Sequence, residues 1–282
     1  MELRRVVVTG IGTINPLGHN VEEYFSALEA GRSGAAPITN FDASNYKVRF
    51  ACEVKNYEWD RYFDRKEVRK YDRFAQFALV AASEAVADAN FGDDVNRRRC
   101  GVVWSSGVGG IDTYYHEVMD YAKGGEIPRF SPFFVPRMIA DLAAGHIAMK
   151  YGFMGPNYSV TSACASSNHA IIDAVNLIRL GKAEVIVTGG SEAPIIQAGV
   201  GGFSSMQALS TRNDDPVHAS RPFDRDRDGF VMGEGAAALV LEEYEHAVKR
   251  GAKIYCEIVG YGANCDAYHV TAPLEDGSVA DW

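Results

Sequence analysis

Apolar residues recur along this chain at two spacings, one typical of strands and one typical of helices. Short apolar runs that end in small or polar residues predict strands in RRVVVTGIG, RRRCGVVWSS, YSVTSA, AEVIVTGG and GAAALVLEEYE. Helical spacing is clearest in YDRFAQFALVAASEAVADAN, where one face holds Phe74, Phe77, Ala78, Ala81, Ala85 and Ala89. The small alanines would let this helix lie close against another element. Alternation of strands and helices predicts an α/β fold with a mainly parallel sheet and helices on its faces.

Glycine and proline mark the ends of several further elements. Helices are predicted in VEEYFSALEA before Gly31, in TYYHEVMDYA, in the second half of SPFFVPRMIADLAAGHIAMKYG, and in EEYEHAVKRGA. A last strand is predicted in KIYCEIVGYG. Residues 34–68 are aromatic and polar without periodicity, and residues 211–230 are densely charged, so both segments are expected at the surface.

Composition excludes several classes of protein. The 282 residues are 47% hydrophobic and 23% charged, which is ordinary for a globular protein of one large or two moderate domains. No apolar run approaches the roughly 18–20 residues that span a bilayer, and the N-terminus has no signal-peptide pattern, so no membrane partner is expected. The formal net charge of -9 argues against a general nucleic-acid binder.

Neither a metal nor a dinucleotide cofactor is indicated. The five cysteines are odd in number and lack CxxC spacing, which argues against a zinc site or a disulfide framework and favours a reducing cytoplasm. Gly10 and Gly12 begin a dinucleotide-like pattern, but Asn15 occupies the place of its third glycine. We therefore interpret these glycines as a tight turn from strand to loop.

Cys164 stands out because it lies between a predicted strand and a predicted helix, among small residues. At a helix N-terminus, backbone N–H groups and the helix dipole favour a thiolate and supply donors for an oxyanion. The small neighbours would admit a bulky acyl group. Cys164 is therefore a candidate nucleophile, although a free cysteine is often simply buried.

A nucleophilic cysteine needs a base or an electrostatic partner, and seven histidines are available. His169 follows Cys164 by five residues, which turns it about 140° around a helix and away from the thiol. His146 is interpreted as a satisfied core histidine. His269 has a suggestive context in a loop with Asp266. The other four lack acidic or cysteine neighbours at ligand spacing: His19, His116, His218 and His246.

The stretch VTSACASSNHAI closely resembles the active-site cysteine motif of the elongating β-ketoacyl-acyl-carrier-protein synthases. The likeness continues, in order, through SPFFVPRMIADLAAGHIAMKYGFMGPN, GGFSSMQALSTRNDDP, ASRPFDRDRDGFVMGEGAAALVLEEYEHAVKRGAKIY and DAYHVTAP. It covers essentially the whole chain and is greatest to the synthase II group of bacterial fatty-acid elongation. The resemblance implies an acyltransferase in which Cys164 takes an acyl chain from acyl carrier protein. Malonyl-carrier protein then loses carbon dioxide and attacks the thioester.

The resemblance also implies a thiolase-like fold, layered αβαβα, in which two similar halves enclose the active site. Residues 1–252 would form the first half, and residues 253–282 the first strand and loop of the second. Family members decarboxylate with two histidines and a lysine that follow the DAYH loop, and the sequence stops at Trp282 before such motifs. We therefore expect the chain to be an N-terminal portion of a longer protein.

Further site residues follow only from the resemblance. Val108 matches the foot of the acyl pocket, Asp266 and His269 a loop that gates it, and Phe203 the substrate-binding region. The carrier protein is expected to dock on basic residues that share one helical side, namely Lys66, Arg69 and Lys70, with Arg129 in addition. The family implies a homodimer, which we expect to form through the strand in AEVIVTGGSEA and its neighbours.

Three alternatives to a fatty-acid condensing enzyme remain. The chain is compatible with a non-catalytic partner half-chain, although such subunits usually lose the nucleophile that is present here as Cys164. A polyketide-type ketosynthase shares the same chemistry and is not separated by the sequence. A cysteine hydrolase or thioesterase would need a Cys–His pair, and none is evident.

Overall fold

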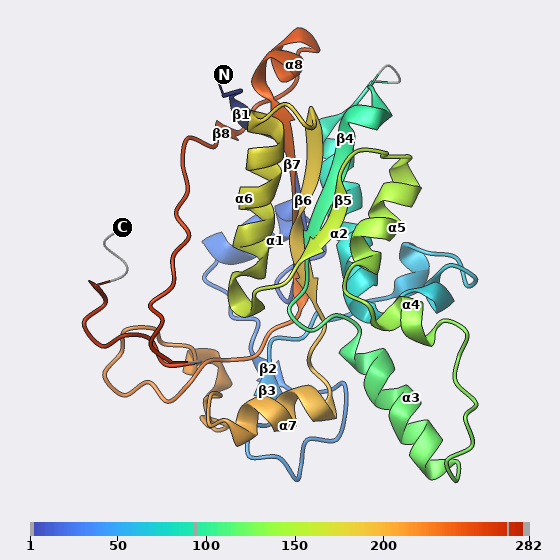
Figure 1. Ribbon diagram of the computed structural model, residues 1–282. Helices are drawn as coiled ribbons and strands as arrows, with labels where there is room; N and C mark the ends of the chain where they lie inside the picture. Colours follow the sequence, from blue (N-terminus) through green and yellow to red (C-terminus); the bar gives the residue numbers. More distant parts are fainter. Residues whose placement is uncertain (1–2, 93–94, 270, 279–282) are drawn as a thin grey trace.

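A mixed six-stranded sheet forms the centre of the molecule in the computed structural model, which describes residues 3–92, 95–269 and 271–278 (Figure 1). The strand order is β5-β4-β6-β7-β1-β8. The strands are β1 (Val6–Ile14), β4 (Cys100–Ser105), β5 (Asn157–Val160), β6 (Val185–Glu192), β7 (Gly235–Glu243) and β8 (Cys256–Glu257). The predicted strands are confirmed, except that the last is only two residues long.

Only two of the five strand pairings in the described sheet are parallel, so the expectation of a mainly parallel sheet is wrong. β4 pairs in parallel with β5 and β6, whereas β7 is antiparallel to β6 and to β1. The cause lies in the long segment between β6 and β7. It returns the chain to the end of the sheet where it left, because Glu192 at the end of β6 pairs with Gly235 at the start of β7.

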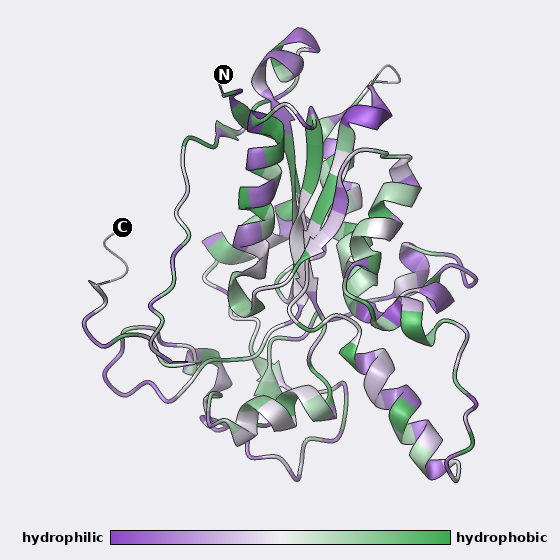
Figure 2. Cartoon of the chain, viewed as in Figure 1, coloured by the Kyte–Doolittle hydropathy of each residue, from purple (hydrophilic) through white to green (hydrophobic). Residues whose placement is uncertain are grey.

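Helices cover both faces of the sheet. Helices α2 (Arg73–Ala89) and α5 (Leu142–Tyr151) pack on one face, and α6 (Ser166–Arg179) packs on the other (Figure 1). The remaining helices are α1 (Val21–Glu29), α3 (Ile111–Lys123), α4 (Phe134–Met138), α7 (Gln197–Ser205) and α8 (Tyr244–Lys249). Figure 2 shows that the strands are green in their upper halves and paler toward their lower ends, where α3 and α7 lie. The apolar core therefore occupies one half of the sheet, and the polar strand ends gather in the other.

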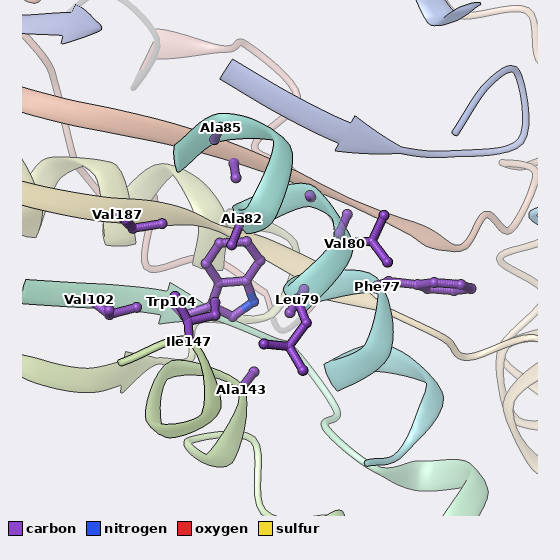
Figure 3. Close-up of a cluster of buried hydrophobic side chains, with 14 of the residues drawn as sticks. Phe77, Leu79, Val80, Ala82, Ala85, Val102, Trp104, Ala143, Ile147 and Val187 are labelled. Carbon is purple, nitrogen blue, oxygen red and sulfur yellow. The ribbon is translucent and has the colours of Figure 1, made fainter. Parts of the chain in front are cut away.

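The largest apolar cluster centres on Trp104 of β4, whose side chain is fully buried. Its indole lies among side chains of α2 and α5, including Ala82, Leu79 and Ile147 (Figure 3). The indole nitrogen donates a hydrogen bond of 3.0 Å to Ser191 Oγ on β6. The core thus fixes two neighbouring strands directly before their polar ends.

Gly10 and Gly12 lie inside β1, not in a turn, which corrects our interpretation of these glycines. A Cβ atom at Gly10 would lie 2.1 Å from the carbonyl oxygen of Ala85, and one at Gly12 would lie 2.2 Å from that of Ala81. The glycines are therefore needed because α2 crosses β1 at backbone contact. The predicted close approach of the alanine face of α2 is confirmed.

Two other segments differ from expectation. Helix α7 was not predicted, because its three glycines hide the helical pattern. Residues 34–68 are more than a surface excursion, since they form the two-stranded sheet β2 (Ala36–Pro37) and β3 (Phe50–Ala51) and bury Phe50 and Val54. The short strand β8 pairs with β1, and a domain division at residue 252 stays a prediction.

Candidate active site

Cys164 lies on a single 3-10 turn, Ala163–Ala165, that joins β5 to the start of α6. Its thiol is free and its side chain is exposed. Ala163, directly before it, has a φ of 50°, in the left-handed region that side chains other than glycine rarely adopt. The predicted placement of Cys164 between strand and helix is confirmed, and the turn presents the thiol at the positive end of α6.

Ser166 closes the turn around Cys164. Its hydroxyl donates to the carbonyl oxygen of Ala163 over 2.6 Å and accepts from the backbone N–H of Ser162 over 2.8 Å. Packing of the helix start is tight, because a Cβ atom at Gly190 of β6 would lie 2.2 Å from Ser167 Oγ. Only glycine at that position lets α6 begin so close to the sheet.

His169 does not serve the thiol of Cys164. Its Nδ1 lies 2.6 Å from Ser162 Oγ, so the imidazole is hydrogen-bonded to the residue two positions before the cysteine. The prediction that helical rotation turns this ring away from Cys164 is confirmed. The ring instead helps to hold the turn.

The remaining histidines give two corrections. His146 is not a satisfied core histidine: its Nε2 is buried without a hydrogen-bond partner among the described residues, and burial lowers its pKa. Three others do have acidic neighbours, three or four residues away: His116 with Asp112, His218 with Asp215 and His246 with Glu242. All seven histidines lie in the described part of the chain, and none of them forms a hydrogen bond or an ion pair with Cys164.

A second loop, residues 106–109 after β4, lies against the turn of Cys164. A Cβ atom at Gly107 would lie 3.6 Å from the carbonyl oxygen of Ala163, and Thr161 Oγ1 donates to the carbonyl oxygen of Ser106 over 3.2 Å. This loop carries Val108, whose side chain is 47% exposed. Val108 is therefore positioned near the cysteine turn, and its role at the foot of an acyl pocket stays a prediction.

Glu192, at the end of β6, holds this second loop, and sequence reasoning missed it. Its Oε1 accepts hydrogen bonds from Ser106 Oγ over 2.9 Å and from the backbone N–H of Gly107. Burial raises the pKa of the Glu192 carboxyl, although these bonds and one from the Val108 backbone oppose the shift. The available signal was a charged residue directly after the apolar run of β6, at the carboxyl end where sites gather in α/β folds.

A cleft of about 550 Å³ opens beside the start of α6. Its lining includes Ser167, Gly190 and Glu192, together with Tyr24, Cys52 and Gly235. Cys164 itself is not among the lining residues. No cluster of three or more histidine, cysteine or acidic side chains suited to a metal ion occurs among residues 3–92, 95–269 and 271–278.

Within the described chain, the other residues expected to bind substrate form no hydrogen bond or ring contact with Cys164. Phe203 of α7 packs in a separate apolar cluster, with its ring 5.6 Å from that of Phe230. Asp266 accepts from the backbone N–H of Leu274, and His269 Nδ1 accepts from that of Ala272. Both thus organise the segment that follows β8, and their role at a pocket stays a prediction.

The expected docking residues are exposed, but they do not lie on one regular helix. Lys66 lies in a turn that Asp64 caps through the Lys66 backbone N–H, and Arg69 and Lys70 lie on the 3-10 turn Val68–Lys70. Arg129 is exposed between α3 and α4. The three residues near position 68 are close in sequence and exposed, and we call them the basic turn (Lys66, Arg69, Lys70).

Comparison with known proteins places this geometry in a family. The family model for the β-ketoacyl synthase N-terminal domain matches residues 3–247. The chain is 48% identical over 278 residues to 3-oxoacyl-[acyl-carrier-protein] synthase 2 of Synechocystis, with 98% of this chain and 67% of that protein covered. It is 45% identical to the protein of the same name from Vibrio cholerae, with 99% and 67% covered. The chain thus spans about two thirds of the length of these relatives.

Solved structures agree with the sequence relatives. A β-ketoacyl synthase from Burkholderia phymatum is 36% identical and superposes with a TM-score of 0.86, over 96% of this chain and 66% of that one. A type II polyketide ketosynthase, solved in complex with its acyl-carrier protein, is 34% identical with a TM-score of 0.88, over 98% and 67%. The thiolase-like fold expected from the sequence is thereby confirmed. Among the described residues, no helix is both long enough and apolar enough to cross a membrane.

Proposed function

The chain belongs to the β-ketoacyl synthase family, and we propose that it carries the acyl-accepting half of a 3-oxoacyl-[acyl-carrier-protein] synthase of fatty-acid elongation. The observation that carries the proposal is the exposed thiol of Cys164 on the turn into the N-terminus of α6. Curated relatives named 3-oxoacyl-[acyl-carrier-protein] synthase 2 match 97–99% of this chain, and they support the proposed activity. The enzyme is an acyltransferase.

The chemistry follows from this placement. The Cys164 thiolate attacks the carbonyl carbon of an acyl thioester, and the carrier-protein thiolate leaves, so the acyl group becomes bound to Sγ. Malonyl-carrier protein then loses carbon dioxide, and its carbanion attacks the same carbonyl carbon and expels the Cys164 thiolate. The product is a β-ketoacyl thioester two carbons longer. Donors at the helix start stabilise the oxyanion formed in both attacks.

The decarboxylation step needs further donors. An enolate develops as carbon dioxide leaves, and it must be stabilised by hydrogen-bond donors near the thioester. Four histidines of this chain are hydrogen-bonded to other groups, namely His19, His169, His218 and His246. The resemblance to the family implies that two histidines and a lysine in motifs after the DAYH loop supply these donors.

The function is tested with acyl-carrier protein and labelled malonyl-carrier protein as substrates for the complete protein. A β-ketoacyl product two carbons longer, with release of labelled carbon dioxide, is expected. Peptide mass spectrometry in the absence of malonyl-carrier protein should find the acyl group on Cys164. Carbon dioxide release without a condensed product would contradict the proposal and would favour a non-catalytic partner subunit.

A polyketide pathway is the second candidate, because solved neighbours include ketosynthases of that type at 36% and 34% identity. The curated fatty-acid relatives are more similar, at 44–48% identity. Carrier proteins that are loaded with saturated acyl chains are therefore the expected substrates. A preference for an unreduced β-keto chain over a saturated chain of the same length would reverse this assignment.

We propose that the acyl carrier protein docks on the basic turn. Its three cations are exposed, and the turn stands out in a chain whose net charge is -9. Replacing Lys66 and Arg69 by glutamate should raise the apparent KM for acyl-carrier protein by about tenfold at low salt, because attraction becomes repulsion at the encounter surface. Steady-state kinetics at two ionic strengths measure the effect.

The matched control reverses two cations that lie far from the basic turn. Arg98 and Lys249 are both exposed, and replacing both by glutamate changes the net charge by the same amount. This control should leave the KM within about twofold. An equal rise in both double variants would mean that net charge, and not the basic turn, governs the encounter.

We also propose a homodimer, but not through the strand that we expected. β6 lies inside the sheet with β4 and β7 on its two sides, so its backbone is already paired. The edge strand on that side is β5, which pairs only with β4 and leaves its other edge open. Light scattering should show a dimer at micromolar concentration, and Ser159→Pro in β5 should weaken it by removing a backbone donor. A monomer in the parent protein would contradict the proposal.

We place the protein in the cytoplasm. All five cysteines are free, and Cys164 must stay reduced to act as a nucleophile. A reducing compartment meets both conditions.

A further inference from the structure

Glu192 is an unusual residue for the place it occupies. It is half-buried at the end of β6, and no ion pair of the described residues involves its carboxylate. All its hydrogen-bond donors come from the loop of residues 106–109. A carboxylate taken from water without a cation is costly, and a neutral acceptor would satisfy the same N–H groups. The side chain of Glu192 is therefore tied to the loop of residues 106–109 through its acceptor oxygen and not through an ion pair.

The contacts of Glu192 continue through the loop to the nucleophile. Ser106 Oγ, which donates to Glu192, also accepts from the backbone N–H of Gly109 over 2.8 Å, so the loop is held at both of its ends. Gly107 is enclosed between Glu192 and Ala163, since its Cβ atom would lie 3.3 Å from Oε1 and 3.6 Å from the Ala163 carbonyl oxygen. Ala163 directly precedes Cys164. One carboxylate thus connects the end of β6 to the cysteine turn.

The loop that Glu192 holds presents an apolar side chain beside that turn. Val108 is 47% exposed although Gly107 and Gly109 on either side are constrained, Gly109 by a φ of 62°. The loop is held at the Ser106 hydroxyl and at the backbone N–H groups of Gly107 and Gly109, and these contacts keep Val108 in one place. An acyl chain bound to Cys164 Sγ that extends along the 106–109 loop would therefore meet a fixed, and not an adjustable, apolar wall.

We propose that Glu192 is a positioning residue that holds the loop of residues 106–109 against the Cys164 turn and thereby sets which acyl chains the thiol accepts. The inference rests on the proposed function of Cys164 as acyl acceptor. Glu192 touches neither the thiol nor the acyl group and acts through Val108. This positioning role is distinct from activation of the thiol, which we assign to the N-terminus of α6.

The test compares two reactions of Cys164 in the complete protein. The first is acylation by acyl-carrier proteins of four to sixteen carbons, followed by mass spectrometry, and the second is alkylation by iodoacetamide. Glu192→Ala should slow acylation by the preferred chain roughly ten- to hundredfold, the cost typical of a misplaced contact, and flatten the chain-length profile. Alkylation should stay within about twofold, because the small reagent needs no acyl wall.

Two further variants make the test specific. Glu192→Gln keeps one oxygen acceptor for Ser106 and Gly107. Its acylation rate should therefore be close to that of the parent and well above that of Glu192→Ala. The control is Glu184→Ala at the start of the same strand, where the glutamate pairs with Arg99 far from the cysteine turn. It should change neither reaction. If Glu192→Ala does not fold, Ser106→Ala removes the same clamp from the other side and is expected to flatten the same profile.

The outcomes separate the inference from the proposed function. An unchanged chain-length profile in Glu192→Ala, or in Ser106→Ala, overturns the inference. An equal fall in acylation and alkylation also overturns it, because that result indicates general distortion of the turn. If the parent protein forms no acyl adduct on Cys164, the proposed function itself fails.

Discussion

Replacing Cys164 by serine should lower acyl transfer by more than about 10³-fold, the scale seen when a covalent nucleophile is lost. A serine hydroxyl has the same shape but needs a general base to become nucleophilic. Among the described residues, no carboxylate or imidazole is hydrogen-bonded to Cys164, and the nearest histidine along the chain, His169, is hydrogen-bonded to Ser162. The variant should therefore fold normally and accept no acyl group. Mass spectrometry after incubation with acyl-carrier protein measures the effect.

The control for Cys164→Ser is Cys256→Ser, since Cys256 is also free and exposed. It lies on β8 and should leave the rate within about twofold of the parent, because an exposed residue away from the site contributes little. Equal acyl labelling of the parent and of Cys164→Ser would show that another residue accepts the chain. That result would refute the assignment of Cys164.

The sequence predicted the fold where periodicity and packing agree. The alanine face of α2 and the apolar run of β4 were recognised from spacing alone, because a helix and a strand bury side chains at different intervals. The direction of β7 was not recognised, since strand direction depends on where a connection of more than 40 residues returns to the sheet. α7 was missed because its glycines have low helix propensity, and because the tertiary contacts of its Val200 and Phe203 in a separate apolar cluster hold it in place.

Prediction of the site shows a similar division. Cys164 was found because a strand, small residues and a helix follow one another in sequence, which is local information. Glu192 was missed because its meaning depends on Ser106 and Gly107, which lie some 85 residues away and reach it only through the parallel pairing of β4 and β6. The unpartnered Nε2 of His146 is equally invisible in the sequence, because it depends on what α5 meets in the core.

Replacing Trp104 by alanine should lower the free energy of unfolding by about 3–5 kcal/mol, the range for removing a large aromatic side chain from a core. Trp104 is fully buried against α2 and α5 (Figure 3), and the surrounding helices cannot collapse fully into the cavity. The variant also leaves Ser191 without its indole donor. Since domains are stable by only about 5–15 kcal/mol, much of the protein should be unfolded or aggregated on mild heating. Urea unfolding followed by circular dichroism measures the change without relying on tryptophan fluorescence.

Trp59→Ala is the matched control for Trp104→Ala, because the same side chain is removed from a short 3-10 turn where it is 39% exposed. It should cost less than about 1 kcal/mol. Trp104→Phe should fall between the two, since a smaller ring leaves a smaller cavity. A cost for Trp104→Ala no larger than that for Trp59→Ala would mean that the apolar cluster around β4 does not hold the sheet together. The strands that end at Ser105 and Glu192 would then need another anchor, because Trp104 joins β4 to β6 directly before those ends.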